Sequence, residues 1–137
     1  MLLMPDCIFC KIVKKEIPAE IVYEDEQFLA FLDIKPVNLG HTLIIPKTHR
    51  PTLVNTPDAT LAAMIVVAKK LMIAIREATD ADFVVLSVVG IDVPHLHFHL
   101  LPRHHDDGLA NFWPTKSATT AEQKSAAEKI RTALARD

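Results

Sequence analysis

Several features that mark large classes of protein are missing from this sequence. No uncharged apolar run approaches the roughly 20 residues that a membrane-spanning helix needs, so we expect no membrane partner. The net charge of -2 lacks the basic excess of a nucleic-acid-binding surface, so we expect no nucleic-acid partner. Residues 1–4 are apolar, but no basic leader accompanies them and Pro5 follows directly, which is unlike a signal peptide. We therefore expect a cytoplasmic protein.

Internal repeats and low-complexity linkers are also absent, and 137 residues suit one hydrophobic core, so we expect a single domain over 1–137. Apolar spacing and turn residues predict strands at 19–24, 27–32, 41–46 and 82–89, and helices at 9–15, 57–79 and about 120–135. The first two strands should form a hairpin over 21–24 and 28–32. Thr56 and Thr119 are the expected caps of the two later helices, and 104–108 is predicted to be a solvated loop. The fold class should be α+β.

Cysteine is scarce, and both cysteines lie together as Cys7 and Cys10. In a reducing compartment this C-x-x-C spacing indicates metal or redox chemistry rather than a structural disulfide. A thioredoxin-like redox pair usually follows a buried strand, and no such strand precedes Cys7. A tetrahedral zinc site needs four nitrogen or sulfur ligands, so two histidines would have to complete it. The candidates are His49 and one member of a later histidine triplet.

Histidine is abundant, with seven copies, and three of them alternate between Pro94 and Pro102 as His95, His97 and His99. On an extended strand these imidazoles would share one face, and the residues between them would face a core. A solvated polar face is the plainer interpretation, but lysine, threonine or glutamate would serve that purpose equally well. Histidine can attack, transfer protons or bind metal near neutral pH, so the triplet indicates a functional site.

The triplet and the Leu-Leu-Pro-Arg segment that ends at Arg103 resemble the bacterial form of the histidine-triad (HIT) family. The cysteine pair with distant histidines resembles the zinc site of zinc-containing triad proteins and of the related galactose-phosphate uridylyltransferases. The resemblance implies a HIT-like fold: a mostly antiparallel sheet, a long central helix and a C-terminal helix. It also implies a structural zinc ion whose ligands are Cys7, Cys10, His49 and His95.

Residues 8–49 resemble the first half of that family, and this resemblance implies a nucleotide site. The base pocket would be lined by Ile8, Phe9, Phe31, Ile34 and Leu43, and Asp33 would hold the ribose. Core packing is the alternative for each apolar residue. An aspartate that opens a turn also often caps its own backbone, which is the alternative for Asp33.

In the resembled family the middle histidine is the nucleophile, which assigns that role to His97. A neutral imidazole can attack phosphorus, and water then cleaves the nucleotidyl-histidine. His99 would contact the phosphate, and His41 would hydrogen-bond within the histidine group. The implied substrates are nucleoside phosphoramidates or related purine nucleotide conjugates. The alternatives are a dinucleoside polyphosphate hydrolase and a zinc-containing nucleotide-binding protein with little turnover.

The sequence departs from the family in the segment before the triplet. Residues 86–94 are shorter than usual and lack the asparagine and glutamine that contact phosphates in the family. Asp92 would place an anionic side chain near a phosphate.

The apolar arc of the 57–79 helix is wider than one buried face requires. We therefore expect a homodimer through that helix and a neighbouring strand.

Overall fold

The structure is a computed structural model that describes residues 3–110 and 114–136. The chain divides into two compact units, Met1–Asp107 and Gly108–Asp137, which are described separately here. The sheet and the predicted site residues all belong to the first unit. Among the described helices, none is both long and apolar enough to cross a membrane.

The first unit is built on a five-stranded sheet in the order β1-β2-β3-β5-β4. Its strands are β1 (Ile21–Glu24), β2 (Phe28–Leu32), β3 (Thr42–Pro46), β4 (Phe83–Ser87) and β5 (Phe98–Arg103). Every neighbouring pair is antiparallel. The predicted β1–β2 hairpin is confirmed, and Asp25 Oδ1 closes its turn by accepting bonds from the Gln27 and Phe28 amides at 2.7 Å each. The predicted α+β class is therefore confirmed.

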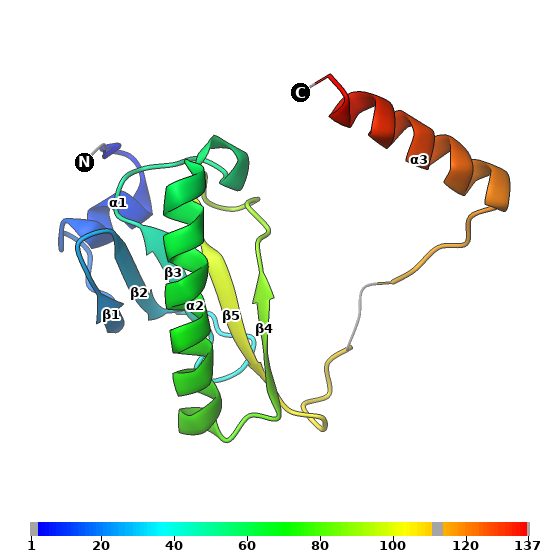
Figure 1. The fold of residues 1–137 in the computed structure, drawn as a ribbon. Helices are drawn as coiled ribbons and strands as arrows, with labels where there is room; N and C mark the ends of the chain where they lie inside the picture. The colour runs from blue at the N-terminus through cyan, green and yellow to red at the C-terminus, as the bar shows by residue number, and fades with distance from the viewer. Residues whose placement is uncertain (1–2, 111–113, 137) are drawn as a thin grey trace. The chain divides into compact units, whose positions relative to one another are not determined.

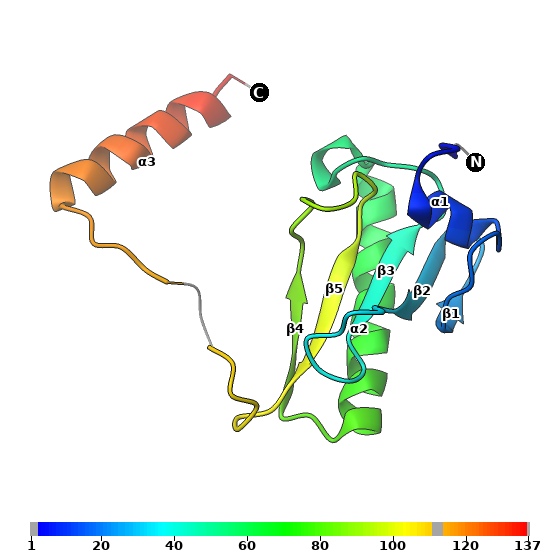
Figure 2. The same cartoon turned by 180° about the vertical axis from the view of Figure 1, so that it is seen from behind.

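Each face of the sheet has its own core because successive side chains on a strand point to opposite faces. One face packs against α2 (Asp58–Thr79), which Figure 1 shows lying across the sheet. Its buried sheet residues include Phe28, Ala30, Ile44, Phe98 and Leu100. The other buried cluster joins α1 (Ile8–Val13) to Leu29, Phe31, Leu43 and Ile45. Figure 2 presents the sheet from behind, with α2 beyond it.

The start of α2 differs from the prediction. Thr56 does not cap the helix: the N-cap residue is Pro57, and no side chain bonds the first turn. The Thr56 hydroxyl instead donates to the Thr52 carbonyl at 2.9 Å. A short 3₁₀ helix, η1 (Leu53–Asn55), occupies the preceding turn and brings that carbonyl within reach. The Thr56 hydroxyl is therefore bonded to Thr52, and Thr56 lies one residue before the N-cap position of α2.

The 104–108 segment also differs from the prediction, because Asp107 is not solvated. Its side chain is 6% exposed and accepts bonds from Arg103 Nε at 2.6 Å and Nη2 at 3.1 Å. A buried guanidinium needs a paired anion, which explains the burial of both groups. Asn38 joins them by donating to Asp107 at 3.1 Å and to the Pro102 carbonyl at 2.9 Å. This network holds the loop before β3 against the end of β5.

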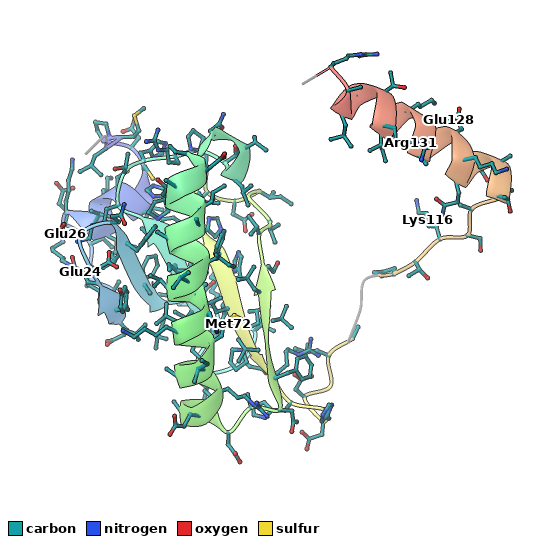
Figure 3. The ribbon with its side chains drawn as sticks, viewed as in Figure 1. Glu24, Glu26, Met72, Lys116, Glu128 and Arg131 are labelled. Carbon is teal, nitrogen blue, oxygen red and sulfur yellow. The ribbon has the colours of Figure 1, made fainter. Side chains whose placement is uncertain are left out.

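The second unit contains α3 (Thr120–Leu134). The predicted cap is confirmed as a reciprocal capping box: Thr119 Oγ1 accepts from the Glu122 amide at 3.1 Å, and Glu122 accepts from the Thr119 amide at 2.9 Å. Glu128 and Arg131 lie along this helix (Figure 3).

Candidate functional site

The histidine triplet alternates as predicted, but only His99 lies within β5. His95 and His97 precede the strand because β3 pairing stops at the Ile44–Phe98 pair. There the Leu96 amide donates to the Arg50 carbonyl at 2.6 Å instead of to a strand. The alternation continues through this segment. The residues between and after the histidines are buried against α2, and they are Leu96, Phe98 and Leu100.

The four predicted metal ligands converge at one point. Cys7 Sγ lies 3.3 Å from His95 Nδ1, and Cys10 Sγ lies 3.4 Å from His49 Nδ1 and 3.6 Å from His95 Nδ1. All four ligand atoms lie within 4.8 Å of one another. Sulfur and nitrogen ligands at ordinary zinc distances and a tetrahedral angle are about 3.6 Å apart. Both cysteines are free thiols. The donor set and its spacing therefore fit a zinc ion.

Neighbouring groups orient these donors. His95 Nε2 donates to the Pro46 carbonyl at 2.8 Å, so its Nδ1 carries the lone pair that faces the cysteines. Burial, opposed by that hydrogen bond, lowers the pKa of His95 to about 4, so the imidazole is neutral near pH 7. The Met4 amide donates to Cys10 Sγ at 3.3 Å. Burial raises the pKa of the Cys10 thiol, so a bound cation would supply the charge that a thiolate requires there.

His97 is held by the backbone. Its Nδ1 donates to the His95 carbonyl at 2.7 Å, which leaves the lone pair on Nε2. A backbone carbonyl, and not a neighbouring imidazole, therefore sets the tautomer of His97. Phe9 packs its ring edge-on against His97, with the ring centres 5.1 Å apart. The His97 side chain is therefore fixed, and its unprotonated nitrogen is free to act as a nucleophile or base.

His41 and His99 form a directed chain of hydrogen bonds. The Val37 amide donates to His41 Nδ1 at 3.1 Å, so the His41 proton is on Nε2. That nitrogen lies 3.0 Å from His99 Nδ1 and 3.6 Å from Asp33 Oδ2. His99 Nδ1 thus accepts, and its Nε2–H remains available as a donor. Burial lowers the pKa of both histidines, with Asp33 opposing the shift, so the chain is neutral near pH 7.

A cavity of about 270 Å³ opens beside His97 and His99. It is lined by all six predicted nucleotide-binding residues: Ile8, Phe9, Phe31, Asp33, Ile34 and Leu43. The buried members Phe9, Phe31 and Leu43 also belong to the core against α1, so both interpretations apply to them. Core packing does not apply to Ile34, which is 90% exposed, or to Ile8, which is 45% exposed. Asp33 accepts from the Lys35 amide at 2.9 Å through Oδ1, which leaves Oδ2 facing His41.

Other residues of this cavity were not predicted as site residues. Ile12 follows Ile8 by one helical turn of α1, so the spacing of that helix could have indicated it. Ile17 and Val93 lie in connecting segments, and no periodic signal marks them. Asp92 also lines the cavity, as its place before the triplet suggested.

Comparison with known proteins agrees with this geometry. The HIT domain family matches residues 14–106. A HIT-like protein of Borreliella burgdorferi is 42% identical over 113 residues, which cover 77% of this chain and 81% of the relative. An adenosine 5'-monophosphoramidase of Saccharomyces cerevisiae is 41% identical over 115 residues, which cover 80% of this chain and 71% of the relative.

Among solved structures, a zinc-bound histidine triad family protein from Mycobacterium smegmatis superposes with a TM-score of 0.73 at 36% identity. The superposition covers 93% of this chain and 97% of that one. The fold, the histidine triplet and these matches lead to one assignment: the chain belongs to the HIT domain family.

Proposed function

We propose that this protein is a nucleotide hydrolase that cleaves nucleoside phosphoramidates through a covalent intermediate on His97. The observation that carries the proposal is the bond from His97 Nδ1 to the His95 carbonyl. This bond leaves the lone pair on Nε2 of His97 free, and His97 lines the cavity together with His99. The similarity to an adenosine 5'-monophosphoramidase supports the reaction class and makes an adenosine phosphoramidate the first substrate to test.

The nucleoside would occupy the cavity beside these histidines. A purine base fits between apolar side chains, and Ile8 and Ile34 expose apolar surface at that position without a core to cover it. Asp33 Oδ2 is the carboxylate oxygen that can accept bonds from the ribose hydroxyls, because Oδ1 already accepts from the Lys35 amide.

The reaction proceeds in two displacements. His97 Nε2 attacks phosphorus and forms a P–N bond, while the bond from phosphorus to the leaving amine breaks and the amine gains a proton. The His99 Nε2–H can donate to a phosphoryl oxygen as charge develops there. Water then attacks phosphorus, the bond to His97 breaks, and a nucleoside monophosphate leaves.

Zinc in this proposal is structural. Cys7, Cys10, His49 and His95 would fill all four positions around the ion, so it offers no site for water or substrate. The ligands come from the start of α1, from the segment after β3 and from the triplet itself. Their convergence fixes the backbone carbonyl of His95, and that carbonyl sets the tautomer of His97.

Substitution of His97 tests the mechanism. His97→Ala should lower single-turnover hydrolysis of adenosine 5'-phosphoramidate by on the order of a thousand-fold or more, because the nucleophile is removed. Nucleotide affinity should be largely kept, because the base and ribose contacts come from elsewhere in the chain. His99→Ala should cost less, since that side chain assists the displacement without forming the new bond. A wild-type rate in His97→Ala would show that His97 is not the nucleophile.

A second candidate is a nucleotide-binding protein with little turnover. The short segment before the triplet favours it, because Asp92 lines the cavity where the family has neutral phosphate-binding side chains. A substrate labelled on the nucleoside distinguishes the two. A hydrolase transfers label to His97 transiently and releases monophosphate continuously. The second candidate binds the nucleotide and releases monophosphate no faster than the uncatalysed reaction.

A further inference from the structure

The nucleotide cavity has an unusual charge balance for a site that receives phosphate. Its lining includes the carboxylates of Asp33 and Asp92, and none of its described lining residues is a lysine or arginine. Asp92 forms no salt bridge with any described residue. Burial lowers the pKa of His99, which lines the cavity, and of His41, whose ring bonds to it. The described residues therefore offer little positive charge to a substrate with several negative charges.

A second hollow, of about 360 Å³, adjoins this cavity. The two share Ile8, Asp92 and Val93, so Asp92 stands at their boundary. The second hollow adds Asp6 and two of the candidate zinc ligands, Cys7 and His49, and its described lining residues also include no lysine or arginine. Zinc held by two thiolates and two neutral imidazoles carries no net charge, so the neighbouring metal site would not offset these carboxylates.

The position of His97 bears on which part of a substrate lies near Asp92. His97 is 5% exposed, and its Nε2 has no hydrogen-bond partner among the described residues, although Nδ1 is bonded. His97 lines the first cavity and also the hollow of Leu53, Val54, Val88 and Val89, but it does not line the second hollow. With the nucleoside in the first cavity, a leaving group on a phosphorus atom near Nε2 would enter the second hollow by passing Asp92, which lines both. A charge on a leaving group that takes this path would lie near Asp92 and, deeper in the second hollow, near Asp6.

We propose that the second hollow receives the leaving group and that Asp92, assisted by Asp6, selects leaving groups with a positive charge. This inference rests on the phosphoramidate hydrolase proposed above and adds the chemical class of the substrate: a nucleoside phosphoramidate of an amine that carries a second, cationic group. Dinucleoside polyphosphates are disfavoured, because their leaving group is a polyanion that approaches uncompensated carboxylates.

The charge of the leaving group does not alter the bonds that change. His97 Nε2 bonds to phosphorus, the P–N bond of the substrate breaks, and the departing nitrogen takes one proton from water. The distant ammonium group keeps its charge throughout. Asp92 is therefore a specificity-determining residue, and its contribution should depend on salt as surface electrostatics do.

Three adenosine 5'-phosphoramidates test the inference without changing size. Each carries the same five-methylene amine chain, which ends in an ammonium, a methyl or a carboxylate group. Wild-type kcat/KM should fall in that order, with about tenfold or more between the ammonium and carboxylate substrates. In Asp92→Asn that ratio should fall to within about threefold. Asp106→Asn removes the same charge outside both hollows and should keep the wild-type ratio. Raising NaCl from about 0.05 to 0.5 M should narrow the wild-type ratio.

The outcomes separate this inference from the proposed function. Equal cleavage of the three substrates, or an unchanged ratio in Asp92→Asn, would overturn the charge selection and leave the hydrolase in place. Faster cleavage of an uncharged tryptamine phosphoramidate than of the ammonium substrate would also overturn it. That result would place the leaving group in the apolar hollow of Leu53, Val54, Val88 and Val89. Failure to cleave even unsubstituted adenosine 5'-phosphoramidate would instead overturn the proposed function.

Discussion

His95 and His97 bond to the backbone through opposite ring nitrogens. His95 gives Nε2–H to Pro46 and presents Nδ1, whereas His97 gives Nδ1–H to His95 and presents Nε2. His99 accepts through Nδ1 from His41 and so presents a proton rather than a lone pair. Three identical side chains thus present a lone pair toward the cysteines, a lone pair on a nitrogen with no hydrogen-bond partner among the described residues, and a hydrogen-bond donor. The neighbouring carbonyls and imidazole decide which role each can fill.

The buried histidines predict how stability depends on pH. Burial lowers the pKa values of His41 and His99 below the usual value near 6.5. The unfolded chain therefore binds more protons than the folded chain once the pH falls below about 6.5, and the free energy of unfolding should fall from there downward. His99→Asn removes one of these groups and should flatten the slope by at most about 1.4 kcal/mol per pH unit.

Urea unfolding at pH 7.5, 6.5 and 5.5 measures this slope. The matched control is His105→Asn, which replaces an exposed histidine outside the site. Identical curves for wild type and His99→Asn would contradict the linkage of His99 to folding.

At the scale of elements, the sequence was informative wherever a pattern repeats. Alternation predicted that Leu96 and Phe98 lie on the sheet face opposite the histidines, where they pack against α2, because successive side chains of an extended segment point to opposite faces. The reciprocal cap at Thr119 was equally predictable, since the capping box has a fixed spacing. The C-x-x-C spacing and the four ligands that zinc requires made His49 a candidate, and the family resemblance completed the set with His95.

Single hydrogen-bond partners were much harder to predict. Thr56 has the identity of a helix cap but bonds to Thr52, because η1 brings that carbonyl within its reach. Asp107 looks like a loop residue but pairs with buried Arg103. The His95 carbonyl that sets the tautomer of His97 carries no sequence signal, since every residue has a carbonyl. Such contacts depend on backbone positions that residue types alone do not determine.

The four candidate metal ligands come from three parts of the chain, and this predicts the effect of removing one of them. Cys7 precedes α1, while its partners His49 and His95 come from segments distant in sequence. Cys7→Ser should therefore destabilise the fold by on the order of several kcal/mol, because a structural metal contributes its binding free energy to folding. The effect on single-turnover chemistry in the folded fraction should be smaller.

Metal analysis and thermal unfolding check this together. Protein purified without chelator should hold about one zinc per chain. Wild type treated with chelator should melt near the temperature of Cys7→Ser. A zinc content near zero in the untreated wild type would contradict the site.

At the scale of the whole molecule, the family match and the two units divide the chain at nearly the same place. The HIT domain match ends at residue 106, and the first compact unit ends at Asp107. The helix α3 has no buried residue within its described range, and its Ile130 and Leu134 are exposed. A single domain over 1–137 stays a prediction. The catalytic and metal-binding candidates all lie in the first unit.

The helix α2 presents apolar surface on a second side. Ile73 and Val66 are 61% and 67% exposed, whereas Met64 and Leu71 are buried against the sheet. A hollow of about 360 Å³ lies between α2 and β4. Most of its lining residues are apolar, including Met72 (Figure 3) and Phe83, and the charged ones are Lys69, Arg76 and Asp82. Since β4 is an edge strand, this surface continues to the side of the sheet. Contiguous apolar surface of this kind marks association sites.

We propose that two copies associate through α2 and β4 as a symmetric homodimer. Light scattering at micromolar concentration should give the mass of two chains. Ile73→Asp should shift the protein toward the monomer, because a buried unpaired carboxylate opposes association. Val22→Asp makes the same change at an exposed residue on β1, the opposite edge of the sheet, and should stay dimeric. A wild-type mass of one chain would rule out the dimer. Equal dissociation by both substitutions would place the interface elsewhere, since only a contact surface at α2 makes Ile73 more sensitive than Val22.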